Sequence, residues 1–415
     1  MRPRIDILID LLHTAFLTSI ATEEATPITC SLAYVNPRDP DPDPPERLRH
    51  PRWRIIPLKK PVAYAVAQLS KLAIAADPAT SILAVFPDRR GELRVWGFCD
   101  QQGGFQAMLS HEGEGGWTPP GSFCIQILGP GHLIVMEDFA VAAEFNKGQL
   151  VEDAVDIFSG NIISRKLAPA YRRRLSGATT LIEREGYSFA AQDYVKHIGP
   201  WYKLIRRILL RARSYRHGAA FLITDSDVTD RVDVKHVIRY ERLPELFEHW
   251  AANEYIEGES DFAIQDALDN AAADIDATLY LANACAHGQV DDSTVALTGA
   301  IEFVASLSRT DGLVLMNTDL VVLGFGCEVT VADTGSCSLY SASHAFPSKG
   351  RLRKLDIRSF GTRHRSMIRY CSADRDAVGF VLSSDGPVRA ITRSGLRVYC
   401  WPNVELAWRA RQKRQ

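Results

Sequence analysis

The feature that most constrains this chain's fold is a change in sequence texture near residue 150. Before it, short apolar runs at residues 82–86, 93–98 and 123–128 are separated by Gly and Pro, which is typical of strands joined by turns. After it, apolar residues recur at helical spacing over long segments. A length of 415 residues also exceeds the usual size of one hydrophobic core. We therefore predict two domains and a fold of the α/β (α+β) class.

The predicted N-terminal domain covers residues 1–160 and is a small, β-rich α+β domain. Apolar residues at helical spacing predict an amphipathic helix within residues 1–20 and a second helix over residues 62–73. Residues 36–51 alternate Pro with Asp and Arg, and such a run cannot bury enough apolar surface to order itself. We interpret that run as an exposed spacer.

The predicted C-terminal domain covers residues 161–415 and has a mixed central sheet flanked by helices. Strands are expected over residues 219–224, 313–316 and 377–382, with a basic helix over residues 201–216. That helix is expected to end at His217-Gly218, with Gly as its C-terminal cap. Residues 240–290 form an acidic helical insertion, and we assign its carboxylates to solubilising surface and not to a metal site.

Overall charge excludes a general nucleic-acid coat protein, since the chain has a net charge of −2. Arginines cluster at residues 172–174 and 206–216, where solvated helix faces account for them. A local nucleic-acid patch is the alternative interpretation, but we expect no nucleic-acid partner.

Cysteine usage and the first residues point to a reducing compartment. None of the eight cysteines forms a Cys-x-x-Cys pair, so we expect buried thiols and no zinc site. Asp6 and Asp10 interrupt the apolar N-terminus, which argues against a signal peptide, and no window is long enough to span a bilayer. The predicted location is cytoplasmic, without a membrane partner.

A five-residue motif, Gly361-Thr362-Arg363-His364-Arg365, has the chemistry of a phosphate site. Guanidinium groups donate bidentate hydrogen bonds to phosphate oxygens, and Gly allows close backbone approach. The motif is expected to begin a helix, whose first N–H groups favour an anion. By itself, His364 is more often a structural hydrogen-bonding residue; within the motif we favour a phosphate contact.

A second motif, Asp311-Gly312, precedes the apolar run at residues 313–315. Asp311 has two interpretations: a turn or capping carboxylate, or the ligand of a divalent cation that arrives with a nucleotide. Together the two motifs predict a metal-dependent nucleotide site, without identifying the reaction.

These motifs, followed by Asp376-Ala377-Val378, resemble the Asp-Gly-Ala and Arg-His-Arg motifs of the bacterial diadenylate cyclase (DAC) family. The resemblance covers residues 195–395. The N-terminal region, notably residues 93–97 and 119–135, resembles the DACNV sensor domain that is fused to some of these cyclases. Trp96 and Trp117 in that region could line a pocket for an unknown sensor ligand, although core packing is the simpler interpretation.

The resemblance implies that two ATP molecules are joined into cyclic di-AMP with release of two pyrophosphates. Each protomer of a homodimer or higher homo-oligomer would hold one ATP, with Mg²⁺ or Mn²⁺ as cofactor. Asp311 would bind the metal and help to activate the ribose 3′-hydroxyl, and Gly312 would allow close ribose approach. Gly361, Thr362, Arg363, His364 and Arg365 would hold the phosphates.

Two positions depart from the family pattern. Leu313 stands where the family has Ala, and Ser384-Asp385 stands where many members have paired glutamates, which makes Asp385 the candidate second metal ligand. These departures suggest an alternative function, in which a degenerate cyclase fold binds a nucleotide and signals without turnover.

Overall fold

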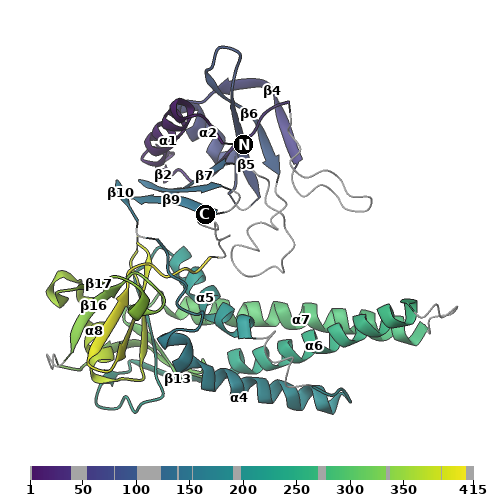
Figure 1. The fold of residues 1–415 in the computed structure, drawn as a ribbon, viewed down its shortest axis with the longest axis vertical. Coiled ribbons are helices and arrows are strands. Elements are labelled where there is room, and N and C mark those ends of the chain that lie inside the picture. The colour runs from purple at the N-terminus through teal and green to yellow at the C-terminus, as the bar shows by residue number, and fades with distance from the viewer. Residues whose placement is uncertain are drawn as a thin grey trace. The chain divides into compact units, whose positions relative to one another are not determined.

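The computed structural model describes residues 2–38, 54–78, 80–100, 123–137, 140–151, 153–189, 198–269, 277–332, 337–384 and 386–407. The chain divides into two compact units, one of residues 1–152 with 407–415 and one of residues 153–406 (Figure 1). The predicted spacer lies largely outside the described residues, as do Trp117 and Asp385. No described helix is both long enough and apolar enough to cross a bilayer.

The first unit is built on an eight-stranded sheet with the order β10-β9-β8-β7-β3-β5-β6-β4. Strands β3 and β5 pair in parallel, and the other neighbours pair antiparallel. The strands are β3 (Cys30–Tyr34), β4 (Arg54–Ala63), β5 (Ser81–Pro87), β6 (Leu93–Asp100), β7 (Phe123–Gly129), β8 (His132–Glu137), β9 (Ala140–Asn146) and β10 (Gln149–Leu150). A short hairpin of β1 (Thr22–Glu23) and β2 (Thr26–Pro27) stands apart from this sheet.

Helices α1 (Ile5–Ser19) and α2 (Val66–Ala75) pack on one face of this sheet. Leu11 of α1 and Leu69 of α2 share a core with Leu32, Leu83 and other strand residues that point to that face. The opposite face carries a second apolar cluster that includes Trp96, whose indole N–H donates to the Val35 carbonyl at 3.0 Å. Trp96 is therefore a core residue, as the simpler interpretation held.

The second unit contains a ten-stranded mixed sheet with the order β12-β15-β14-β11-β18-β19-β20-β16-β17, and β13 also pairs with β15. Strands β11 and β14 are parallel, as are β16 and β20. The strands are β11 (Ala219–Ile223), β12 (Val232–Asp233), β13 (His236–Tyr240), β14 (Leu313–Met316), β15 (Val322–Val329), β16 (Ser338–Ala342), β17 (Leu352–Lys354), β18 (Val378–Leu382), β19 (Val388–Ser394) and β20 (Arg397–Trp401).

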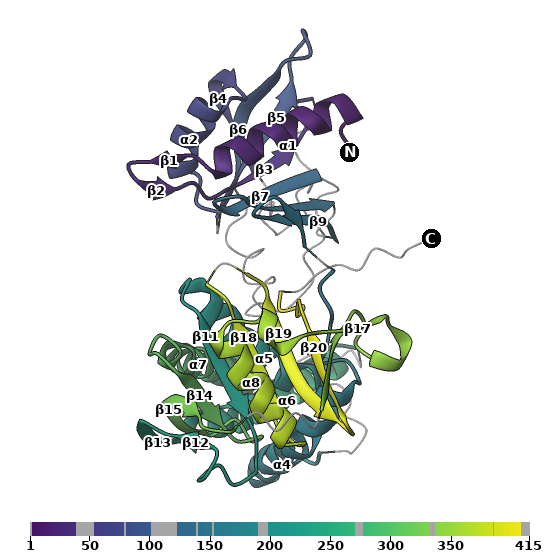
Figure 2. The ribbon, with the colours of Figure 1, turned by 90° about the vertical axis from the view of Figure 1, so that its left-hand side faces the viewer.

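Helices cover both faces of this sheet, so the second unit has three layers (Figure 2). Alternate residues of a strand point to opposite faces. Phe221 of β11 therefore packs with α4 (Ile162–Arg184), α5 (Ile198–Ser214), α6 (Arg242–Asp269) and α7 (Ala277–Leu307). Leu222 points the other way, toward α8 (Thr362–Ala373). Short 3₁₀ turns, Pro347–Lys349 and Ile357–Ser359, precede α8.

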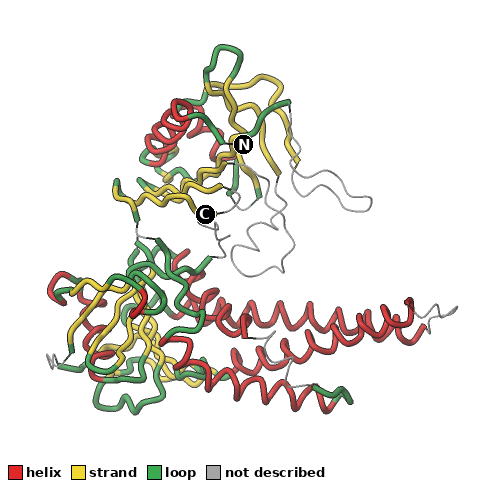
Figure 3. The backbone as a smooth tube through the Cα atoms, in the orientation of Figure 1, coloured by secondary structure: helices red, strands yellow, loops and turns green. Residues whose placement is uncertain are grey.

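Figure 3 shows that the long helices belong to the second unit, whereas strands dominate the first. The predicted fold class, a β-rich first part and a mixed sheet with flanking helices, is confirmed. The acidic insertion is the antiparallel pair α6 and α7. Residues Val155, Ile157 and Phe158 pack in the core of the second unit.

Two local predictions are wrong. Val62 belongs to strand β4 and not to the helix that follows, because β6 pairs with it. The basic helix α5 ends at Ser214, and the residue with left-handed backbone is Arg216, with φ of 52°. Gly218 is therefore not the helix cap.

Two phenylalanines on α6, one buried and one exposed, allow a matched test of how this helix packs. Phe247 is completely buried, with its ring centroid 5.0 Å from that of Trp201, whereas Phe262 on the same helix is 70% exposed. Phe247→Ala should lower the free energy of unfolding by about 3–5 kcal/mol, because a large buried ring leaves a cavity. Phe262→Ala should change it by less than about 0.5 kcal/mol. Urea denaturation measures both, and equal effects of the two variants would contradict this packing.

Candidate functional site

The two sequence motifs meet at one edge of the second unit's sheet. Asp311 lies just before β14, and Arg363 lies in the first turn of α8. The Arg363 Nη2 atom donates a hydrogen bond to Asp311 Oδ1 at 3.2 Å, across 52 positions of sequence. Their side chains are 43% and 91% exposed, so the contact is at the surface. We call this pair and the adjoining first turn of α8 the Asp311–Arg363 site.

Gly218 is a third component of this site. It precedes β11, which runs parallel to β14, so the segments before both strands lie at the same edge. A Cβ atom on Gly218 would lie 2.6 Å from Nη1 of Arg363. The absence of a side chain at position 218 therefore makes room for the Arg363 guanidinium.

The start of α8 has the form that the sequence predicted. The helix begins at Thr362, with Gly361 as an N-cap whose backbone is extended and which supplies no side-chain cap. Gly361, Thr362 and Arg363 are exposed, and Arg365 is half-buried. The first N–H groups of a helix carry partial positive charge and lack partners within the helix. An anion could therefore bind at this end, next to the guanidinium of Arg363.

Position 312 requires glycine because of its backbone conformation and its close approach to β15. Its φ is +108°, and a Cβ atom there would lie 2.5 Å from the carbonyl carbon of Gly326 in the neighbouring strand β15. The close approach that the structure contains at Gly312 is thus between strands of the sheet. Its contact with a ribose stays a prediction.

His364 points inward from the motif. It is 8% exposed, and Nη1 of Arg389 lies 2.7 Å from its Nε2 atom. Burial, together with the nearby charges of Arg389 and Arg363, lowers the pKa of His364 from 6.5 to about 4. The imidazole is therefore neutral at pH 7, and its Nε2 atom accepts from Arg389. This geometry favours the structural interpretation of His364, and its phosphate contact stays a prediction.

Arg389 was not anticipated from the sequence. It lies on β19, and its guanidinium also lies over the Phe360 ring, 5.8 Å from the centroid. Since no local pattern links residues 25 positions apart on a helix and a strand, only the fold could identify this contact.

Of the two predicted metal ligands, Asp311 and Asp385, only Asp311 lies within the described residues. Asp311 offers an exposed carboxylate, and Mg²⁺ is commonly bound by one or two carboxylates together with substrate phosphates. The Asp311 carboxylate is therefore chemically suited to Mg²⁺ or Mn²⁺, and the binding of either ion stays a prediction. Asp385 lies outside the described residues. Within the described ranges, no three His, Cys, Asp or Glu side chains gather as a metal site.

Leu313 packs in the core under α8. It is 6% exposed and belongs to the apolar cluster that contains Met367 and Cys371. Its size is therefore accommodated by helix packing in this unit.

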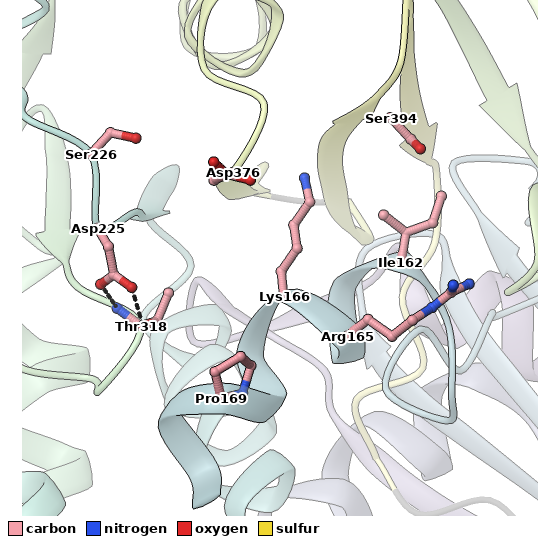
Figure 4. A pocket seen from close by; sticks show the side chains of 9 residues that line it. All are labelled: Ile162, Arg165, Lys166, Pro169, Asp225, Ser226, Thr318, Asp376 and Ser394. Carbon is pink, nitrogen blue, oxygen red and sulfur yellow. Dashed lines mark hydrogen bonds between the residues drawn. The ribbon is translucent and has the colours of Figure 1, made fainter. Parts of the chain in front are cut away.

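A separate hollow of about 620 Å³ lies at the other edge of the same strands (Figure 4). It adjoins the end of β11 at Asp225, the end of β14 at Thr318 and the start of β18 at Asp376. The carboxyl ends of parallel strands are a common place for ligands, so this hollow is a second candidate. It does not include any residue of the two sequence motifs.

Two polar side chains at this hollow, Lys166 and Asp225, are held by hydrogen bonds within the protein. Lys166 extends from α4 (Figure 4). Its amine donates to the carbonyls of Arg375 at 2.6 Å and Arg393 at 2.9 Å and to Thr392 Oγ1 at 2.5 Å. Burial lowers the pKa of Lys166. Asp225 accepts from the backbone N–H and the hydroxyl of Thr318. These bonds tie α4 and two loops to the sheet, which is a structural role.

Comparison with known proteins identifies part of the first unit. Residues 1–100 match the family model described as "Probable sensor domain DACNV". This confirms the sensor domain expected at the N-terminus, and the rest of the chain has no family assignment. No curated protein and no solved structure matched the chain.

The environment of His364 predicts its titration. Its NMR signals should stay unchanged from pH 8 to pH 5.5 and shift only near pH 4, because burial and two guanidinium groups disfavour the charged form. Since the folded-state pKa is below 6.5, His364 should reduce stability as the pH falls from 6.5 toward 4. Arg389→Met should move the midpoint toward 6.5. A wild-type midpoint near 6.5 would contradict the buried, neutral imidazole.

The two motif glycines should respond differently to Ala. Gly312→Ala should lower the free energy of unfolding by at least about 2 kcal/mol, because it combines a left-handed backbone with a clash against β15. Gly361→Ala should cost less than about 1 kcal/mol, because nothing lies within 4 Å of the added atom. Thermal melting compares the two, and a tolerated Gly312→Ala would refute the close strand approach.

Proposed function

We propose that the second unit is a nucleotidyltransferase that joins two ATP molecules into cyclic di-AMP, with the N-terminal sensor domain regulating it. The observation that supports this most is the contact between Asp311 and Arg363 at the start of α8. A carboxylate, a guanidinium and a helix N-terminus at one edge of a sheet are the groups that a metal-bound triphosphate needs.

Arg363 and the first turn of α8 would bind phosphate oxygens, Arg363 through its guanidinium and the turn through backbone N–H groups. Both partners of the Asp311–Arg363 ion pair are well exposed, so the pair contributes at most about 1 kcal/mol. An incoming triphosphate can therefore take Arg363 and release the carboxylate. Asp311 is then available to a Mg²⁺ or Mn²⁺ ion, which when bound compensates phosphate charge and polarises the α-phosphate.

The reaction would need two copies of the site. The 3′-hydroxyl oxygen of each ribose forms a bond to the α-phosphorus of the other ATP, the bond to the β-phosphate oxygen breaks, and pyrophosphate leaves. Asp311 orients the hydroxyl, whose proton passes to that carboxylate or to water. Asp311, Thr362 and Arg363 are all exposed, which suits a site that a second protomer covers.

The ion pair also supports an alternative function. Because Asp311 is engaged by Arg363 in this conformation, a unit that keeps this pair could bind ATP without cyclising it. Such a unit would signal nucleotide occupancy without producing cyclic di-AMP.

Incubation of the full-length protein with ATP and Mg²⁺ or Mn²⁺ tests the proposal, with products identified by mass spectrometry. Cyclic di-AMP is expected, and its rate of formation per protein should rise with protein concentration, since two protomers meet. Asp311→Asn should reduce the rate by about 100-fold or more, because a group in contact with the reacting hydroxyl is lost.

Glu183→Gln is the matched control, since Glu183 is an exposed carboxylate near the end of α4 and belongs to neither candidate site. It should leave the rate unchanged. ATP binding by calorimetry without product would favour the alternative function, and absence of both binding and product would refute the proposed site.

A further inference from the structure

A row of small side chains crosses the sheet of the first unit. Cys124 of β7 is paired with Ala33 of β3. Ala33 is also paired with Ala84 of β5, and Ala84 is paired with Gly97 of β6. Paired residues of neighbouring strands point to the same face, which here is the face away from α1 and α2 (Figure 2). We call these four residues the small-residue row.

The backbone of β4 closes one end of this row. A Cβ atom on Gly97 would lie 2.8 Å from the Ile56 carbonyl oxygen, so no further group fits over position 97. Cys124, Ala33 and Ala84 remain, and their short side chains let another group approach the strands closely. Neighbouring strands lie about 4.8 Å apart, so these three positions span roughly 10 Å. That span is close to the length of a two-ring aromatic molecule.

A buried hydroxyl group without a partner lies beside the row. Ser31 precedes Ala33 by two residues on β3, so both side chains point to the same face. Ser31 is 1% exposed, and no group within the described part of the chain forms a hydrogen bond with its Oγ atom. Buried hydroxyl groups in proteins nearly always have a partner, because leaving one unsatisfied is unfavourable. A ligand with one hydrogen-bonding group would satisfy it.

The surroundings of the row favour a particular class of ligand. Along β3, β5 and β7, every residue that alternation places on this face is uncharged, so a charged ligand would be buried without a partner. Cys99, Cys124 and Met136 belong to the apolar cluster on this face, and sulfur atoms make favourable contacts with aromatic rings. An apolar lining with few polar groups is typical of small-molecule sites.

We propose that the small-residue row and Ser31 form the ligand site of the sensor domain, and that its ligand is an uncharged aromatic molecule of one or two rings. The ring lies on Ala33 and Ala84, and one polar group of the ligand bonds to the Ser31 hydroxyl. The residues matched by the sensor family, 1–100, include β3, β5 and β6 of this row. The site is independent of any nucleotide chemistry at the Asp311–Arg363 site.

Saturation-transfer NMR with the full-length protein tests this site. The probes are a library of uncharged one-ring and two-ring aromatic fragments, with indole and phenol among them. At least one fragment should bind saturably, and calorimetry gives its affinity. Ser31→Ala should weaken that affinity about tenfold, because one buried hydrogen bond is lost. Ala33→Val should abolish binding, because its added methyl groups occupy the place of the ring. A carboxylate derivative of the same fragment should bind at least tenfold more weakly.

Ser70→Ala is the matched control, because Ser70 is a buried serine of α2, on the other face of the sheet. It should bind the fragment like the wild type. Thermal melting without ligand should show that Ser31→Ala is as stable as the wild type, since the hydroxyl it removes has no partner. The proposal is overturned if no fragment binds saturably, or if Ser31→Ala and Ala33→Val both bind like the wild type. A clear loss of stability in ligand-free Ser31→Ala would also overturn it, because the hydroxyl would then serve the fold.

Discussion

The arrangement of the second unit depends on one pairing, that of β11 with parallel β14 on one side and antiparallel β18 on the other. Because β11 and β14 run in the same direction, Gly218 and Asp311 lie at the edge where both strands begin. Helix α8 must then return the chain to the start of β18 at the opposite edge, so its first turn lies beside Asp311. The meeting of the two motifs is thus a consequence of strand direction.

The same strand pairing places the polar groups of this unit at two opposite edges of the sheet. The exposed carboxylate and guanidinium lie where β11 and β14 begin, whereas the hydrogen bonds of Lys166 lie at the other edge, beside the hollow. The acidic helices α6 and α7 are inserted between β13 and β14, so that their length does not disturb the sheet. The basic first turn of α8 and the acidic hairpin of α6 and α7 are therefore separate elements of the same unit.

Much of this could be predicted because it is encoded locally. Short apolar runs predicted β11, β14 and β18, the sequence predicted the acidic helices, and a helix was expected to begin within residues 362–365. The errors arose where tertiary contacts override local preference. Val62 pairs with Val95 in the sheet, and Gly218, which resembles a helix cap, is small because of Arg363. Arg389 could not be found at all, since its partner His364 is on another element.

By itself, the sequence determined the division into a β-rich part and a mixed part, the N-terminal sensor family, the residues of the two motifs and the acidity of the hairpin. The sensor family rests on the match of residues 1–100 to a family model. The other features follow from composition, periodicity and short motifs, which depend on residues that are near one another in the chain. The tertiary structure decided that Asp311 contacts Arg363 and that Gly312 lies too close to β15 to carry a side chain. It also decided that His364 is buried and neutral, and that Phe262 is exposed while Phe247 is buried. Each of these depends on which distant segment packs beside the residue, and strand pairing and helix packing alone set that.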